Sequence, residues 1–233
     1  AGAGAAGATG AGRERRLFDE LDAVIAWSMR LTDKPLPFGS MARVFHPDRV
    51  IEGHSNMVPE AQRVFRQLAS DPRVQGVCEV GFNGGHSALR WLLHSRARVL
   101  SFDLGEHHYS RPAAMWLASR FPGRLEVVWG DSLVEVPKLL AQRPDTRCEL
   151  VFVDGGHSTD LARADLRHLQ AFANPEFNRV ILDDTFLSDV KVAWDEMVAE
   201  GRVEPLHVYE GTLADGNSYG FSVGQYVAGT GKA

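Results

Sequence analysis

The sequence lacks several features that would assign a class of function directly. Its longest apolar runs have only the length of strands, so we expect no membrane span. Its 25 Lys and Arg residues are outnumbered by 30 Asp and Glu residues, and a net charge of −5 argues against a nucleic-acid partner. The 44% hydrophobic and 24% charged content is typical of globular proteins in water. We therefore expect a soluble protein that acts on small molecules.

Cysteine is also scarce, with only Cys78 and Cys148 in the chain. Each lies in or next to a predicted buried strand, and the two show no C-x-x-C spacing. We interpret them as inert thiols of the core rather than a disulfide or a zinc site. This interpretation favours the cytoplasm or another reducing compartment.

The N-terminal region divides into three parts. Residues 1–12 contain almost only Ala and Gly, without the apolar core of a signal peptide, and we predict a disordered tail there. Between residues 13 and 31, apolar residues at helical spacing predict an amphipathic helix that could contact a second subunit; they are Leu17, Leu21, Val24, Ile25 and Met29. Residues 33–55 are rich in Pro and Gly and predict a lid-like loop. The core domain is expected over residues 56–233.

The rest of the chain alternates between strand-like and helix-like segments. Apolar strand-like runs lie at 77–80, 98–102, 125–129, 150–153 and 180–182. Helical patterns lie between them at 88–94, 113–120, 134–142 and 161–172. Such alternation predicts a parallel sheet with helices on both faces. Two closing strands near 204–209 and 219–227, joined by a turn-rich segment, predict a terminal antiparallel hairpin. The fold class is therefore α/β, Rossmann-like and mostly parallel.

Carboxylates follow two of the predicted strands directly. Asp154 ends the run Leu-Val-Phe-Val and is followed by Gly-Gly-His157, and Asp183 and Asp184 end the run Arg-Val-Ile-Leu. Parallel strands end at the same edge of a sheet, so these groups should converge. Because gathered carboxylates repel one another, the cluster predicts a cation, with Mg²⁺ preferred by three hard oxygen ligands and Ca²⁺ or Mn²⁺ as alternatives.

A second set of polar residues follows the first three strands. Glu79 and a glycine-rich loop, Gly81-Phe-Asn-Gly-Gly85, precede a predicted helix N-terminus, which favours an anionic group such as a carboxylate. This loop lacks the spacing of a dinucleotide fingerprint, and Glu79 would repel a pyrophosphate. Asp103 ends the second strand, where it could accept ribose hydroxyls, and Gly130-Asp131-Ser132 ends the third. Alternatively, the glycines only form a turn, and Asp103 or Asp131 only caps a helix.

In order and spacing, these motifs resemble the class I S-adenosylmethionine-dependent methyltransferases across residues 56–227, a family with a seven-stranded sheet. The resemblance implies that Gly81 and Ser87 hold the methionine end of the cofactor, Asp103 the ribose, and Asp131 with Ser132 the adenine. The full set expected to bind the cofactor is Glu79, Gly81, Asn83, Gly85, Ser87, Asp103, Asp131, Ser132 and Asp154.

Within this family, D-G-G-H followed 29 residues later by D-D resembles the metal-dependent O-methyltransferases of the catechol and macrolide-sugar types. The catechol type has a lysine at the position of His157 and an amide at that of Asp184, whereas the sugar type has a histidine at the former. The resemblance implies that Asp154, Asp183 and Asp184 bind the metal.

His157 follows Asp154 closely enough to act as the general base on a metal-bound hydroxyl. Its alternative role is that of a loop histidine that bonds the backbone or caps the next helix, and for Asp183 and Asp184 the alternative is helix capping. We expect His86 to carry no chemistry and the pair His107-His108 to lie on the surface.

The leading hypothesis is a Mg²⁺-dependent O-methyltransferase acting on a vicinal diol or catechol-like hydroxylated small molecule. Three rivals stay open: a metal-independent N- or O-methyltransferase, a non-catalytic scaffold on the same fold, and a nicotinamide oxidoreductase. Phe45, His54 and Met57, upstream of the core, are candidates for the mouth of the substrate site. The sequence does not identify the acceptor or the oligomeric state.

Overall fold

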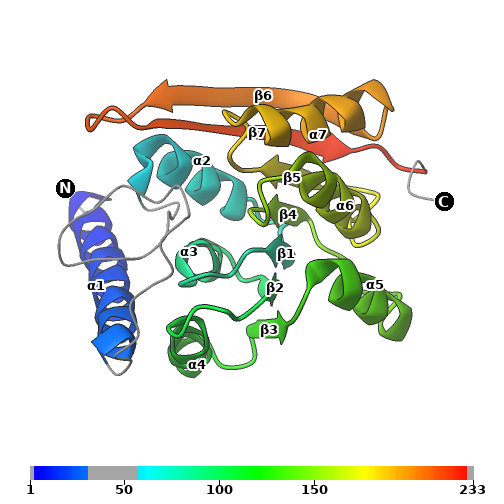
Figure 1. Ribbon diagram of the computed structural model, residues 1–233. Helices are drawn as coiled ribbons and strands as arrows, with labels where there is room; N and C mark the ends of the chain where they lie inside the picture. The colour runs from blue at the N-terminus through cyan, green and yellow to red at the C-terminus, as the bar shows by residue number, and fades with distance from the viewer. Residues whose placement is uncertain (1–2, 31–56, 230–233) are drawn as a thin grey trace.

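The computed structural model describes residues 3–30 and 57–229 (Figure 1). The seven strands are β1 (Gly76–Val80), β2 (Arg98–Asp103), β3 (Leu125–Trp129), β4 (Leu150–Val153), β5 (Arg179–Leu182), β6 (Val203–Thr212) and β7 (Ser218–Tyr226). The helices are α1 (Ala3–Arg30), α2 (Pro59–Ala69), α3 (His86–His94), α4 (Ser110–Arg120), α5 (Ser132–Gln142), α6 (Thr159–Gln170) and α7 (Ser188–Ala199).

All strands form one sheet in the order β3-β2-β1-β4-β5-β7-β6. The first five strands pair in parallel, and β7 is antiparallel to both β5 and β6. The prediction of a mostly parallel α/β sheet with a terminal antiparallel hairpin is confirmed. Val80 pairs with Phe102 of β2 and with Val153 of β4, so these strands end at one edge. The residues that follow the strands therefore meet there.

Helices cover both faces of the sheet, and each face has its own apolar core (Figure 1). Helices α1 to α4 supply one core, and α5 to α7 supply the other. Phe65 of α2 lies at the centre of the first core, with its ring 5.2 to 5.3 Å from the rings of Trp91, Phe152 and Phe221. Burial of such aromatic side chains is the main favourable term for this packing. Among the described helices, none is both long enough and apolar enough to cross a bilayer.

The N-terminal helix begins earlier than we predicted. Helix α1 starts at Ala3, so it includes most of the Ala/Gly segment that was expected to be disordered. Alanine has the highest helix propensity of the residues, and here the propensity of the alanines outweighs the helix-destabilising effect of the glycines among them. The predicted apolar face is confirmed at Leu17, Leu21 and Ile25, which are buried.

Helix α1 lies outside α3 and α4 in Figure 1 and packs against both. Its Asp22 carboxylate lies 2.9 Å from Nε2 of His86, and its Glu14 lies within 3.4 Å of Arg90 and His94. The apolar face that suggested a contact with a second subunit is therefore covered by the same chain.

The cysteine prediction was wrong, because Cys78 and Cys148 form a disulfide. Cys78 lies in β1, and Cys148 lies on the chain that enters the neighbouring strand β4. Both belong to the core under α5 to α7, with Cα atoms 5.8 Å apart. That separation suits a disulfide, and strand pairing between residues 70 positions apart creates it. The two cysteines therefore do not indicate a reducing compartment.

Candidate functional site

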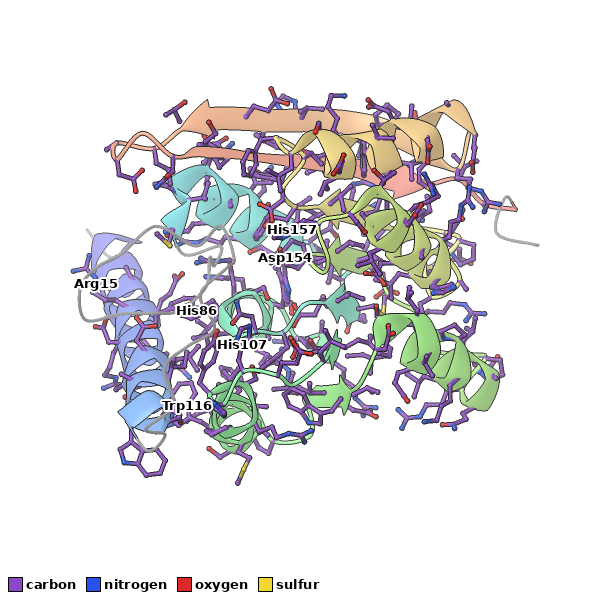
Figure 2. The ribbon with its side chains drawn as sticks, viewed as in Figure 1. Arg15, His86, His107, Trp116, Asp154 and His157 are labelled. Carbon is purple, nitrogen blue, oxygen red and sulfur yellow. A yellow bond between two sulfur atoms is a disulfide. The ribbon has the colours of Figure 1, made fainter. Side chains whose placement is uncertain are left out.

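A cavity of about 530 Å³ opens at the carboxyl edge of the parallel strands. In Figure 2, Asp154 and His157 lie close together near β4, and His107 lies towards α4. Nine of the predicted site residues line the cavity: Gly81, Asn83, Asp103, Asp131, Ser132, Asp154, His157, Asp183 and Asp184. Residues expected from five different strand ends are thus brought to one space.

Three predicted cofactor residues, Glu79, Gly85 and Ser87, do not line the cavity. Glu79 is fully buried, and its carboxylate accepts hydrogen bonds from Ser87 Oγ (3.0 Å), Trp91 Nε1 (2.9 Å) and Ser101 Oγ (2.8 Å). Burial raises the pKa of Glu79 to about 7, against the lowering effect of these three donors. The structure therefore assigns Glu79 to the support of the loop.

The glycine loop is held close to the end of β4. Gly81 has φ +95°, and a Cβ atom there would lie 1.9 Å from the backbone oxygen of Asp154. Only glycine fits such a contact at this φ. Asn83, with φ 49°, donates its backbone N–H to Asp103. The loop thus connects the acids that end β2 and β4.

Asp103 ends β2 and lines the cavity, as predicted. Its two carboxylate oxygens accept hydrogen bonds from the backbone N–H of Asn83 (2.8 Å) and of Gly105 (2.7 Å). The Tyr109 hydroxyl in turn donates to Asn83 Oδ1 at 2.6 Å. These contacts fix the carboxylate, and each oxygen keeps a second lone pair for a ligand hydroxyl.

The polar residues after β3 are engaged in local contacts. Asp131 caps α5 by accepting a hydrogen bond from Leu133 N at 2.9 Å, and it also lines the cavity. Ser132 Oγ donates to Asp165 Oδ1 at 2.6 Å. Asp165 lies on α6, is 1% exposed and also lines the cavity, and burial raises its pKa to about 6. Asp165 was not predicted as a site residue, because it lies within a helix rather than at a strand end.

The carboxylates after β4 and β5 converge as predicted. Burial, followed by repulsion from Asp183 and Asp184, raises the pKa of Asp154 well above its usual range. The pKa of Asp183 rises to about 7 through burial and repulsion by Asp184. His157 Nε2 lies 2.9 Å from Asp184 Oδ2. The site is therefore an acidic cluster with one imidazole.

In the described part of the chain, Asp183, Asp184 and His157 do not take the helix-capping roles that were their alternatives. Helix α7 begins after Leu187, so neither Asp183 nor Asp184 caps it. Helix α6 is capped by Ser158, whose Oγ accepts from Leu161 N, so His157 does not cap it. Within residues 3–30 and 57–229, no three His, Cys, Asp or Glu side chains are already arranged as a metal-ligand set.

Apolar side chains also line the cavity, and most of them were not predicted as site residues. Met57 lines the cavity as predicted, whereas Phe45 and His54 lie outside the described residues. Phe186 follows the acidic pair, Leu213 lies in the turn after β6, and Tyr219 lies in β7. In the sequence, Leu213 is part of a turn-rich segment and Tyr219 begins a predicted closing strand, and neither pattern indicates a site.

His107 also lines the cavity, although we expected it on the surface with its neighbour His108. Its ring stacks on that of Tyr109, with centroids 5.0 Å apart. His86, in contrast, is buried and lies outside the cavity lining.

Comparison with known proteins agrees with this architecture. Residues 78–185 match the family described as a methyltransferase domain. An O-methyltransferase from Streptomyces achromogenes, TomG, involved in tomaymycin synthesis and solved with S-adenosylmethionine, superimposes with a TM-score of 0.61 at 18% identity, over 90% of each chain. An O-methyltransferase from Bacillus cereus in complex with S-adenosylhomocysteine gives a TM-score of 0.63 at 15% identity, over 88% of this chain and 90% of that one. A search of the curated proteins finds no match.

Proposed function

We propose that the chain is a class I S-adenosylmethionine-dependent methyltransferase that methylates a hydroxyl of a vicinal diol or catechol-like small molecule with the help of a divalent metal. The match of residues 78–185 to a methyltransferase domain and the fold shared with O-methyltransferases support this proposal. The observation that carries the proposal is the convergence of Asp154, Asp183, Asp184 and His157 on the cavity that also contains Asp103.

The charge of the cavity supports a cationic methyl donor. In the described part of the chain, its lining contains seven carboxylates and neither Lys nor Arg; the acids are Asp103, Glu106, Asp131, Asp154, Asp165, Asp183 and Asp184. A sulfonium with an α-ammonium group is favoured in such a field, whereas a pyrophosphate is repelled. This argues against the nicotinamide alternative.

The donor set fits a hard divalent cation in its chemistry. Asp154 and Asp183 are acids whose pKa values rise partly through repulsion by neighbouring carboxylates, and a cation would relieve that repulsion. Asp184 is the third expected ligand. Its Oδ2 contacts His157, so its other oxygen would bind the metal. When bound, Mg²⁺ would lower the pKa of an acceptor hydroxyl and hold a neighbouring oxygen beside it.

The residues of the chain would then perform the proton transfer and the positioning. His157 would donate its Nε2–H to Asp184 and take the hydroxyl proton on Nδ1, and Asp184 would hold the imidazole and stabilise the imidazolium. The acceptor oxygen would attack the methyl carbon, the new C–O bond would form as the S–C bond breaks, and sulfur would keep the electron pair. Phe186 and Tyr219 would contact the apolar part of the acceptor. Alignment of the two substrates can supply about 7 to 11 kcal/mol of the acceleration.

The contact between His157 and Asp184 also supports a second candidate, a metal-independent methyltransferase. A histidine oriented by a carboxylate is a competent base without a metal. In this case, Asp154 and Asp183 would bind an amine or the cofactor instead.

The test is methyl transfer from radiolabelled S-adenosylmethionine to catechol, with resorcinol, whose hydroxyls are not adjacent, as the matched control acceptor. We expect labelled product from catechol only, loss of turnover in EDTA and recovery on addition of Mg²⁺. His157→Ala should lower kcat by about 10²- to 10⁴-fold. Turnover that is unchanged in EDTA would support the metal-independent candidate. The absence of both cofactor binding and turnover would leave the scaffold alternative.

A further inference from the structure

Asp165 is the one carboxylate of the cavity lining that comes from the body of a helix rather than from a strand end or loop. It lies on α6 and is 1% exposed. Ser132 Oγ, at the start of α5, donates to its Oδ1 at 2.6 Å. One oxygen of this buried carboxylate therefore has a hydrogen-bond donor. The second oxygen should also have one, because a buried carboxylate oxygen without a donor is destabilising.

Oδ2, the other oxygen of Asp165, lies directly beside Gly155. A Cβ atom at Gly155 would lie 2.9 Å from Oδ2, closer than real Cβ atoms come to such an atom. Gly155 and Asp165 both line the cavity. Among the described residues, no donor forms a hydrogen bond with Oδ2, so this oxygen is an acceptor open to a ligand.

The neighbouring polar residues of the lining, Asp131 and Ser132, already form hydrogen bonds within the protein. Asp131 Oδ1 accepts from Leu133 N as the cap of α5, and the proton of the Ser132 hydroxyl points to Asp165. The resemblance assigned adenine to Asp131 and Ser132. Asp131 keeps Oδ2 for a ligand, but its side chain is exposed, whereas Asp165 is buried. A hydrogen bond to a buried carboxylate oxygen discriminates more strongly than one to an exposed carboxylate, so Asp165 Oδ2 is the better acceptor for a donor group of the base.

Two exposed apolar side chains of the same cavity lining suit a flat ring. Leu104, which follows Asp103, is 59% exposed, and Leu161, on α6, is 39% exposed, although both line the cavity. Exposed leucines of this kind lose unfavourable contact with water when an aromatic base covers them.

We propose that Asp165 Oδ2 accepts a hydrogen bond from the exocyclic amine of the adenine ring, so that Asp165 sets the preference of this cavity for a 6-aminopurine nucleoside. The inference rests on the proposed function only in that S-adenosylmethionine occupies this cavity. Asp165 would act as a specificity-determining residue, and Ser132 would position it.

The experiment is isothermal titration of S-adenosylhomocysteine and of S-inosylhomocysteine, in which a 6-oxo group replaces the amine. A hydrogen bond to a charged group is worth about 1.5 to 3 kcal/mol, so the wild type should prefer S-adenosylhomocysteine by about 10- to 100-fold. In Asp165→Asn, the amide oxygen can still accept from Ser132, and the amide nitrogen can donate to the 6-oxo group. The preference should then fall below about threefold or reverse.

Asp160→Asn is the matched control. Asp160 lies on the same helix with its side chain 91% exposed and pairs with Arg163, so it should keep the wild-type ratio. Equal weakening of both ligands by Asp165→Asn, with the ratio retained, would contradict the inference and leave Asp165 a structural role. A wild type that does not discriminate between the two bases would contradict it without any variant. A wild type that binds neither ligand would instead contradict the cofactor assignment itself, and the inference with it.

Discussion

The substitution Glu79→Gln tests how the glycine loop is supported. Glu79 is fully buried, and its carboxylate is surrounded by three donors, from Ser87, Trp91 and Ser101. A glutamine has nearly the same shape. Its oxygen can accept from Trp91 and Ser87, and its amide can donate to the Ser101 hydroxyl, which also accepts. The variant therefore removes a charge while all three contacts can persist.

The size of the effect follows from the pKa of Glu79. A rise from the ordinary value of 4.5 to about 7 corresponds to about 3 kcal/mol. Because the folded-state pKa lies above the unfolded one, the folded protein binds more protons between pH 4.5 and 7. The stability contributed by this group is therefore fully present below pH 4.5, falls as the pH rises through this window and levels off above pH 7.

The assay is urea unfolding of the wild type and the variant at pH 5.0 and pH 8.5. We expect the two proteins to differ by less than about 1 kcal/mol at pH 5.0, and the variant to be more stable by about 2 to 3 kcal/mol at pH 8.5. Parallel pH dependences of the two proteins would refute the reasoning. A variant that is less stable at both pH values would show instead that the three hydrogen bonds need the carboxylate.

Three further outcomes are expected. Gly81→Ala should lower the free energy of unfolding by about 3 kcal/mol or more, because its Cβ would lie 1.9 Å from the Asp154 backbone oxygen. The control Gly123→Ala has open space around the Cβ at φ +73° and should lower it by about 1 to 2 kcal/mol. Equal losses in urea unfolding would contradict this. Thiol titration of the denatured, unreduced protein should find no free thiol, and two thiols would rule out the bond between Cys78 and Cys148. Reduction should lower the free energy of unfolding by about 4 kcal/mol, since the bond closes a loop of some 70 residues, and an unchanged urea midpoint would speak against that contribution.

The sequence predicted the parts of the fold that depend on local pattern. Apolar runs that stop at Asp103, Asp154 and Asp183 identified the strands and placed their acids at one edge, because parallel strands end together. The hairpin was predicted by the same means. The start of α1 was not, since an Ala/Gly composition reads equally well as a helix or as a tail.

The features that the sequence missed depend on contacts between distant segments. The bond between Cys78 and Cys148 requires two strands to pair across 70 positions, and no spacing rule encodes that pairing. In the sequence, Asp165 has the pattern of an ordinary polar position of an amphipathic helix. Only the structure shows that it lies beside Gly155 in the cavity lining. Glu79 carries the motif that suggested ligand contact, yet its side chain points into the protein.

The central claim, a methyltransferase site with a divalent metal, is tested most directly by calorimetric titration of Mg²⁺ into the protein saturated with S-adenosylhomocysteine. The wild type should bind S-adenosylhomocysteine and show one specific ion site per chain. The double variant Asp183→Asn with Asp184→Asn should lose the ion site and keep its affinity for S-adenosylhomocysteine within about threefold, because the expected ribose acceptor, Asp103, is intact. Tight binding of S-adenosylhomocysteine without any specific ion site in the wild type would contradict the metal-dependent account.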